Sequence, residues 1–320
     1  MIHRLMHPLA HALTLVLTIW QSVAAAGTAI TVQDDAGATI MLTQPAKRVV
    51  SLAPHVTEML YAAGGEGRIV GAVSYSDYPA AALALPRVGD HNRLDLERIL
   101  ALKPDLIVVW LHGGAARQLE PLRKLGIPLY YSDPRRLDDI PQSVERLGRL
   151  MGTESQARAV ATETRLQLAG LGGRYRHRSP VRVFYQVWDQ PLYTLNGETV
   201  LSDVIRLCGG ENVFAGLALK APVVGVEAVI AANPEAIFSG DTRNRTDRAL
   251  DAWKAFPSLA AVRQGNLFSV NADLLNRATP RIVAGATDMC EKLEQARSRR
   301  VPVLPPVLSP APVPAQSKQP

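Results

Sequence analysis

Three side chains suited to holding a flat ligand follow predicted strands in the first part of the chain. Tyr75 follows the apolar run 69–73, Trp110 follows the run 105–109, and His91 follows the loop 86–90. Parallel sheets bind ligands beyond the carboxyl ends of their strands, where aromatic rings offer a large apolar contact area. Taken alone, Trp110 is equally well explained by packing under a loop. The three residues together predict one wall of a ligand site.

Two further pairs of residues in the second half of the chain could bind a ligand or form a covalent bond. Asp273 and Arg277 lie four positions apart after the predicted strand 267–270, a spacing that is often only a surface ion pair. Cys208 and Cys290 are the only two cysteines. In an exported protein such a pair favours a disulfide, whereas a structural metal site would need three or four ligands.

The sequence lacks the residues for several other functions. It contains no Gly-x-Ser-x-Gly and no His-Glu-x-x-His pattern, so we expect no enzymatic activity. The formal net charge is +6, but the basic residues are spread along predicted helices as on a solvated face, and no nucleic-acid motif occurs. A carrier of free metal ions would need closely spaced ligands. The histidines after residue 26 lie far apart in the sequence. They are His55, His91, His112 and His177.

A long helical stretch with a similar segment on each side must position these residues. Residues 140–176 predict two consecutive helices separated at Met151-Gly152, with a capping box from Thr153 to Gln156, and the second forms a rod of roughly 30 Å. Segments 96–107 and 226–237 share Glu, Ala, Pro, an acid and Ile in one register. Each predicts a short helix, then a residue-Pro step and a buried strand. The predicted fold class is α/β, with two Rossmann-like lobes joined by a long rigid backbone helix and a ligand cleft between them.

Composition divides the chain into five segments. Residues 1–26 resemble a secretory signal peptide, with an uncleaved anchor as the alternative, and residues 299–320 form a Pro-rich tail expected to be disordered. Between them we predict an N-terminal lobe over 27–137, connecting helices over 138–178 and a C-terminal lobe over 179–298. Neither cysteine lies near the cleavage region, so we expect a freely soluble exported protein rather than a lipid-anchored one.

Several motifs resemble those of one family of transport proteins. They are the run Ser74-Tyr75-Ser76-Asp77-Tyr78-Pro79, the runs 96–99 and 101–106, Trp110 with Gly113-Gly114, and the Cys-Gly-Gly-Glu-Asn run at 208–212. These are similar to the periplasmic cobalamin-binding proteins of bacterial ABC importers and, less closely, to relatives that bind haem or ferric siderophores. The resemblance covers roughly residues 48–293, apart from the helical stretch. It implies a periplasmic protein that captures cobalamin or another corrinoid and delivers it to an ABC permease with ATPase subunits.

The resemblance also implies roles for individual residues. Glu97 and Glu227 match glutamates that meet arginines on a two-fold permease, although a glutamate near a helix start is also explained by the helix dipole. Cys208 and Cys290 match the positions of the family's disulfide. We expect a monomer without an intrinsic cofactor. The implied ligand-binding residues are Tyr75, His91, Trp110, Trp188, Asp273, Asn276 and Arg277.

The chain departs from the family pattern at three positions. His91 replaces a tryptophan, a second tryptophan is missing near residues 221–223, and Asn276 replaces an acid. Fewer indoles predict weaker binding of the full vitamin unless Trp188 or Tyr193 compensates. His91 suggests a further hypothesis, since a neutral imidazole is a good axial ligand for the metal of haem or of a corrinoid without its lower base. The other interpretation is an exposed loop residue. Haem or ferric-siderophore binding remains the alternative function.

Overall fold

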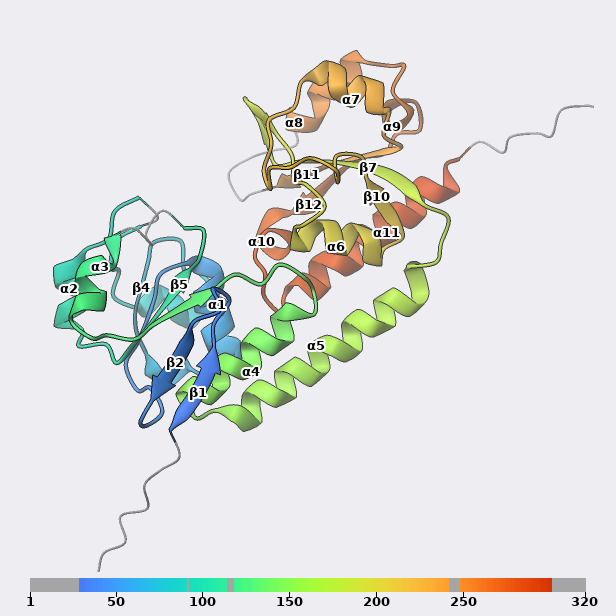
Figure 1. Cartoon of the computed structure of the whole chain (residues 1–320). Coiled ribbons are helices and arrows are strands. Elements are labelled where there is room, and N and C mark those ends of the chain that lie inside the picture. Colours follow the sequence, from blue (N-terminus) through green and yellow to red (C-terminus); the bar gives the residue numbers. More distant parts are fainter. Residues whose placement is uncertain (1–28, 91, 114–117, 242–247, 301–320) are drawn as a thin grey trace, which may run out of the picture.

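Two α/β lobes, joined by a pair of consecutive helices, form the protein (Figure 1). The computed structural model describes residues 29–90, 92–113, 118–241 and 248–300. Each lobe contains a four-stranded parallel sheet with helices packed against it, which confirms the predicted fold class. The predicted signal peptide, His91 and the tail beyond residue 300 lie outside the described residues. The exact lobe boundaries remain a prediction.

The N-terminal lobe is organised around strands that are buried along their whole length. In β5 every residue from Leu106 to Val109 is buried and only the last, Trp110, is exposed, as expected for a strand covered on both faces. An antiparallel hairpin, β1 (Ile30–Gln33) and β2 (Thr39–Leu42), precedes the sheet. The sheet order is β4-β3-β5-β6. After the hairpin, the strands and helices of this lobe are β3 (Val49–Ser51), α1 (Pro54–Ala62), η1 (Glu66–Arg68), β4 (Ile69–Ala72), η2 (Ala80–Ala84), α2 (Leu96–Ala101), β5 (Leu106–Trp110), α3 (Glu120–Lys124) and β6 (Leu129–Ser132).

The C-terminal lobe has the same sheet arrangement. Its sheet order is β10-β7-β11-β12, so in both lobes the first strand of the sheet lies between the second and the third. The topological switch point is the place where the strand order reverses, and ligands bind there in such sheets. It lies between β3 and β5 in one lobe and between β7 and β11 in the other. The elements are β7 (Val181–Gln186), β8 (Trp188–Asp189), β9 (Leu192–Tyr193), α6 (Val200–Leu207), β10 (Gly210–Asn212), α7 (Val226–Ala232), β11 (Ala236–Asp241), α8 (Arg248–Asp251), η4 (Ala252–Ala255), α9 (Ala260–Arg263), β12 (Leu267–Asn271), α10 (Ala272–Leu275) and α11 (Ile282–Ser298).

The repeated sequence segments form equivalent structures in the two lobes. Lys103 and Asn233, each directly before a proline, both have positive φ angles, 46° and 41°, and end the short helix before the strand. The acidic residue after each of these prolines also has the same role in both lobes, because its carboxylate accepts hydrogen bonds from the backbone of a neighbouring segment. Asp105 accepts hydrogen bonds from the backbone of Lys47 and Arg48, and Glu235 accepts one from the backbone of Arg182. The internal repeat in the sequence thus corresponds to a repeated supersecondary unit.

The connection between the lobes consists of α4 (Asp139–Met151) and α5 (Glu154–Tyr175). Gly152 ends α4 in the left-handed conformation, as predicted, and α5 has 22 residues, about 33 Å at 1.5 Å each. The predicted capping box is wrong. The Thr153 hydroxyl donates to the carbonyl of Ala63 in the N-terminal lobe, so it fixes α5 to that lobe instead of capping its first turn.

The lobes and the connection share one apolar core. A continuous cluster of buried side chains extends from the first sheet through α4 and α5 to α6 and α11. Cys208, at the end of α6, forms a disulfide with Cys290 on α11, across 82 residues of sequence, which confirms the predicted pairing. In the part of the chain that the structure describes, no helix is both long and apolar enough to cross a membrane.

Candidate functional site

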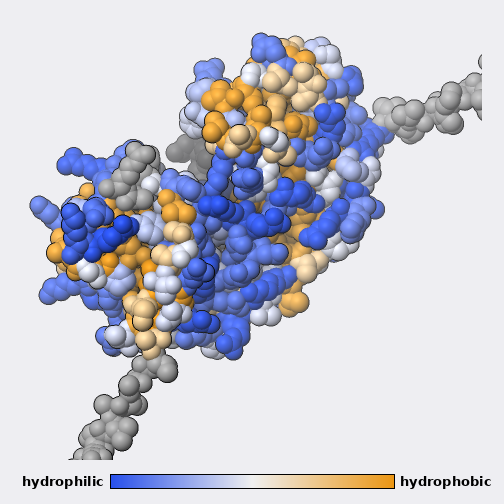
Figure 2. All heavy atoms as spheres, in the orientation of Figure 1, coloured by the Kyte–Doolittle hydropathy of each residue, from blue (hydrophilic) through white to orange (hydrophobic). Residues whose placement is uncertain are grey.

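A cavity of about 590 Å³ lies between the lobes, and its wall is mostly apolar. The N-terminal lobe lines it with the loops after β3, β4, β5 and β6, and the C-terminal lobe with the residue after β7, the start of α6 and the loop after α10. The cavity therefore lies at the carboxyl ends of the strands in both lobes, where the sequence predicted it. Figure 2 shows a recess between the two lobes, with apolar residues of the C-terminal lobe beside it.

Two of the predicted aromatic residues line this cavity with large exposed surfaces. Tyr75 is 74% exposed and Trp110 is 41% exposed. Tyr75 has a φ angle of 65°, a left-handed conformation that is unfavourable for a bulky residue. Its neighbours hold it there, because Ser74 bonds to the carbonyl of Gly89 and the buried Ser76 accepts from Thr57. Backbone strain of this kind is concentrated at functional sites, so the conformation is consistent with a contact role for the ring.

A polar cluster around Asp133 occupies one side of the cavity. The Asp133 carboxylate accepts from the indole of Trp110 at 3.3 Å and from Arg135 at 2.8 Å, and His112 Nε2 lies 3.1 Å away. Lys220, from the other lobe, is 3.6 Å from the same carboxylate. Burial by itself would raise the pKa of Asp133, but the hydrogen bond from Arg135 and the positive charge of Lys220 lower it. The cluster orients the Trp110 ring and places cationic groups at the cavity wall.

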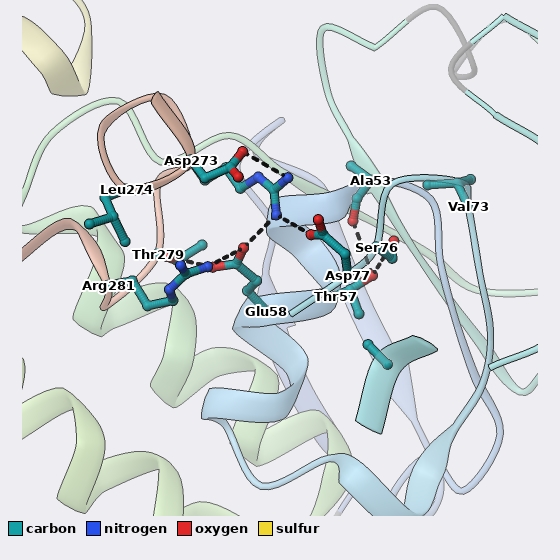
Figure 3. A network of polar contacts seen from close by, with 12 residues as sticks. Ala53, Thr57, Glu58, Val73, Ser76, Asp77, Asp273, Leu274, Thr279 and Arg281 are labelled. Carbon is teal, nitrogen blue, oxygen red and sulfur yellow. Dashed lines mark hydrogen bonds and ion pairs between the residues drawn. The ribbon is translucent and has the colours of Figure 1, made fainter. Parts of the chain in front are cut away.

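A second cluster, here called the interlobe latch, joins the lobes beside the cavity (Figure 3). It consists of Glu58, Asp77, Asp273, Arg277, Thr279 and Arg281. Glu58 on α1 is only 2% exposed, and its carboxylate accepts from Arg277 at 2.7 Å, Arg281 at 3.0 Å and Thr279 at 3.1 Å. Arg277 also pairs with Asp77 and Asp273, at 3.0 Å each. Burial alone would lower the pKa of Arg277, but its carboxylate partners raise it. The latch thus ties the loop before α11 to the N-terminal lobe.

The latch limits the number of hydrogen bonds that Arg277 can donate to a ligand. Its Nη1 donates to both Glu58 and Asp77, which uses both hydrogens of that nitrogen. The Nη2 group faces Asp273. Arg277 still lines the cavity, so at most its Nε–H and one Nη2–H remain for a bound molecule.

The other predicted ligand residues are placed differently from one another. Asn276 lines the cavity, and its Oδ1 accepts from the hydroxyl of Tyr185 at 3.2 Å, which leaves its amide hydrogens available. Trp188 is 49% exposed on the β8–β9 hairpin, and its neighbour Val187 rather than Trp188 itself lines the cavity. Asp273 reaches the site only through Arg277. His91 lies outside the described residues.

Sequence reasoning missed several residues of the cavity wall, among them Asp133, Arg135, Lys220 and His55. His55 is the one whose ring packs against that of a predicted aromatic residue. It lies in the first turn of α1, directly after β3, and its ring meets Trp110 edge-on with centroids 5.7 Å apart. Pro54 is the first helical residue, a position that suits proline because its missing N–H would have no partner there. The sequence feature that could have identified His55 is its position a few residues after the buried strand β3.

The lining of the site suits a large organic ligand. Its wall combines apolar side chains, exposed aromatic rings and a few polar groups, the usual composition of a pocket for a large organic molecule. Among the described residues, no group of three or more His, Cys, Asp or Glu side chains is placed to hold a metal ion.

Comparison with known proteins gives consistent matches over most of the chain. A model of the periplasmic binding protein family matches residues 49–274. The vitamin B12-binding protein of Vibrio parahaemolyticus is 38% identical over 260 residues, 81% of this chain and 94% of that protein. The crystal structure of the periplasmic vitamin B12 binding protein BtuF of Vibrio cholerae superposes with a TM-score of 0.73 at 38% identity, over 79% of this chain and 98% of that one. The periplasmic heme-binding protein RhuT from Roseiflexus has a TM-score of 0.69 at 25% identity, over 78% and 98% of the two chains.

Proposed function

Since the chain belongs to the periplasmic binding protein family, whose members supply substrate to ABC importers, we propose that it captures a corrinoid, either cobalamin or a close relative. It then delivers this ligand to a membrane permease with its ATPase subunits. It is not an enzyme. We further propose that residues 1–26 are removed on export, that the mature protein is a free monomer without a lipid anchor, and that the permease is two-fold symmetric.

The observation that carries the proposal is the pair of exposed rings on the wall of the interlobe cavity. Tyr75 and Trp110 present apolar faces to a space that both lobes enclose, and a corrin ring is flat and largely apolar on its faces. Asn276 and the remaining N–H groups of Arg277 supply donors for the polar edge of such a ring. We propose that Trp188 covers the ligand from the hairpin, and that Asp273 acts by orienting Arg277.

Haem is the second candidate ligand, and one observation favours it. Three cationic or potentially cationic side chains, His112, Arg135 and Lys220, line the cavity. Among the described residues they share a single carboxylate partner, Asp133, so they retain capacity to bind the carboxylates of a haem edge. The heme-binding protein RhuT has the same fold at lower identity.

One titration separates these ligands. The purified mature protein is titrated with cyanocobalamin, cobinamide and haemin, and binding is followed by absorption and by calorimetry. We expect the corrinoids to bind at least ten times more tightly than haemin, a difference of about 1.4 kcal/mol. Tight binding of haemin with a Soret band, without corrinoid binding, would refute the corrinoid proposal and support haem.

Tyr75→Asn tests the contact role of the ring without damaging the fold. Asparagine tolerates the left-handed conformation better than tyrosine does, so the variant should be as stable as the wild type or more stable. Loss of the ring should nevertheless weaken corrinoid binding roughly tenfold or more, because one aromatic contact is worth about 1–3 kcal/mol. Unchanged affinity in a stable Tyr75→Asn variant would exclude a ligand role for this residue.

We propose that Glu97 and Glu227 dock the protein onto its permease. Both are exposed in the first turn of their helices, α2 in one lobe and α7 in the other, at matching positions of the internal repeat. Neither forms an ion pair with any residue that the structure describes. Two equivalent carboxylates on a pseudo-symmetric protein can meet equivalent cations on a symmetric partner.

Charge reversal tests the docking role. Glu97→Lys combined with Glu227→Lys should abolish corrinoid uptake in cells while leaving corrinoid binding by the purified protein unchanged. Glu154→Lys is the matched control, because Glu154 is also exposed in the first turn of a helix but lies on the connection. Wild-type uptake by the double variant, or an equal loss in the control, would contradict the docking role.

A further inference from the structure

His55 is a histidine on the cavity wall whose ring nitrogens bond to none of the residues that the structure describes. It is partly buried in the first turn of α1, and its ring is held nearly perpendicular to that of Trp110, at 88°. Neither ring nitrogen has a hydrogen-bond partner in the described part of the chain. A histidine held at the wall of an organic-ligand cavity without a protein partner is available to the ligand itself.

The second histidine on the same wall, His112, is in a different situation. Its Nε2 lies 3.1 Å from the Asp133 carboxylate and 3.5 Å from Arg135. It is also exposed. His112 is therefore already paired, and the comparison singles out His55 as the side chain with a free lone pair.

The surroundings of His55 keep its imidazole neutral. Burial lowers its pKa to about 4; nearby Asp133 opposes this shift and Arg277 adds to it. The amino-terminal end of α1 acts in the same direction, since a helix start disfavours positive charge. A neutral imidazole has an unprotonated nitrogen, which is the form that binds cobalt or iron.

We propose that His55 is an axial ligand to the metal at the centre of the bound macrocycle. This inference rests on the proposed function and specifies its substrate class as a corrinoid with an exchangeable axial position. In the binding step the lone pair of one imidazole nitrogen forms a bond to Co(III), and the bond from Co(III) to its axial water breaks. The water leaves, the oxidation state of cobalt does not change, and no proton is transferred.

The arrangement around His55 supports this role over simple packing. Trp110 fixes the imidazole ring from the side, and Trp110 is in turn held by Asp133 through its indole N–H. An imidazole that this ring contact already holds in position loses little freedom when it binds a metal. A corrinoid with both axial positions blocked cannot use this bond. The site should thus discriminate between corrinoids by their axial ligands.

The experiment compares two cobinamides that differ only in their axial ligands. Diaquacobinamide has exchangeable water, whereas dicyanocobinamide has both positions occupied by tightly bound cyanide. Wild-type protein, His55→Ala and His177→Ala are titrated with each compound at pH 7, and absorption and affinity are recorded. His177 is the matched control, because it is an exposed histidine that does not line the cavity. We expect the wild type and His177→Ala to shift the absorption bands of diaquacobinamide, and His55→Ala not to do so.

The affinities provide the second readout. His55→Ala should bind diaquacobinamide roughly tenfold or more weakly than the wild type, since it loses one coordinate bond, and dicyanocobinamide with the same affinity as the wild type. Retained dicyanocobinamide binding also shows that the variant is folded. An unchanged band shift in His55→Ala, or a shift lost in His91→Ala but kept in His55→Ala, would overturn the inference while leaving corrinoid binding intact. Failure of the wild type to bind either cobinamide would overturn the proposed function, and the inference with it.

Discussion

Glu58→Gln should destabilise the protein strongly, because this substitution removes the central charge of the interlobe latch. Glu58 is 2% exposed and receives three hydrogen bonds, two of them from arginines. Removing one member of a buried ion pair costs about 3–5 kcal/mol. The Gln carbonyl still accepts one bond, and the side chains of Arg277 and Arg281 are 15% and 24% exposed, so water can partly solvate them. We therefore expect a loss of about 2–4 kcal/mol in the free energy of unfolding.

The assay is urea unfolding at pH 7 followed by circular dichroism. The matched control is Glu66→Gln, an exposed glutamate in the same lobe, which should change the free energy by less than about 0.5 kcal/mol. A thermal scan should show a fall of roughly 5–15 °C for Glu58→Gln. A double-mutant cycle with Arg277→Met should give a coupling of about 1–3 kcal/mol between the lobes. If Glu58→Gln and Glu66→Gln had equal stability, the latch would not be holding the lobes together.

Three more perturbations have defined outcomes. In the ligand-free protein His55 has a pKa of about 4, below its unfolded value of 6.5, so it contributes stability above pH 6.5 that is lost as the pH falls to 4. The drop in unfolding free energy from pH 7 to 4.5 should be about 1–2 kcal/mol smaller in His55→Gln, measured by urea titration. Replacing Cys208 and Cys290 by serine should cost about 2–4 kcal/mol in the same assay, and an unchanged unfolding midpoint would contradict this. Gly148→Ala should cost about 1–3 kcal/mol because its Cβ would collide with α5, whereas Gly170→Ala, on open surface, should be neutral or stabilising.

Local sequence patterns predicted the architecture well because the fold depends on periodic burial. The buried run before Trp110 and the Gly152 helix stop are features of a few neighbouring residues, and each lies where the sequence placed it. The internal repeat predicted two similar lobes, which the common strand order confirms. The Thr153 cap failed because a tertiary acceptor, the carbonyl of Ala63, competes for its hydroxyl and is invisible in the local sequence.

The candidate site was only partly predictable, because its polar contacts join residues far apart in the sequence. The pair Asp273 and Arg277 was recognised from its spacing, but Glu58, the buried partner of Arg277, lies more than 200 residues away. Nothing near residue 58 indicates that a buried carboxylate will meet two arginines there. His55 could have been found, because it lies a few residues after the buried strand β3, at the carboxyl end of the sheet where ligands bind.

The latch and the connection together determine how the site binds its ligand. The lobes are joined at one side by α4, α5 and their shared core, and beside the cavity by Glu58, Arg277 and Arg281. An ion pair between Asp133 and Lys220 joins the lobes at one side of the cavity. Opening the lobes would break the ion pairs beside the cavity, and water would then have to solvate the buried Glu58 carboxylate. The cavity is therefore largely formed before the ligand arrives, so that binding does not have to offset the cost of closing two lobes.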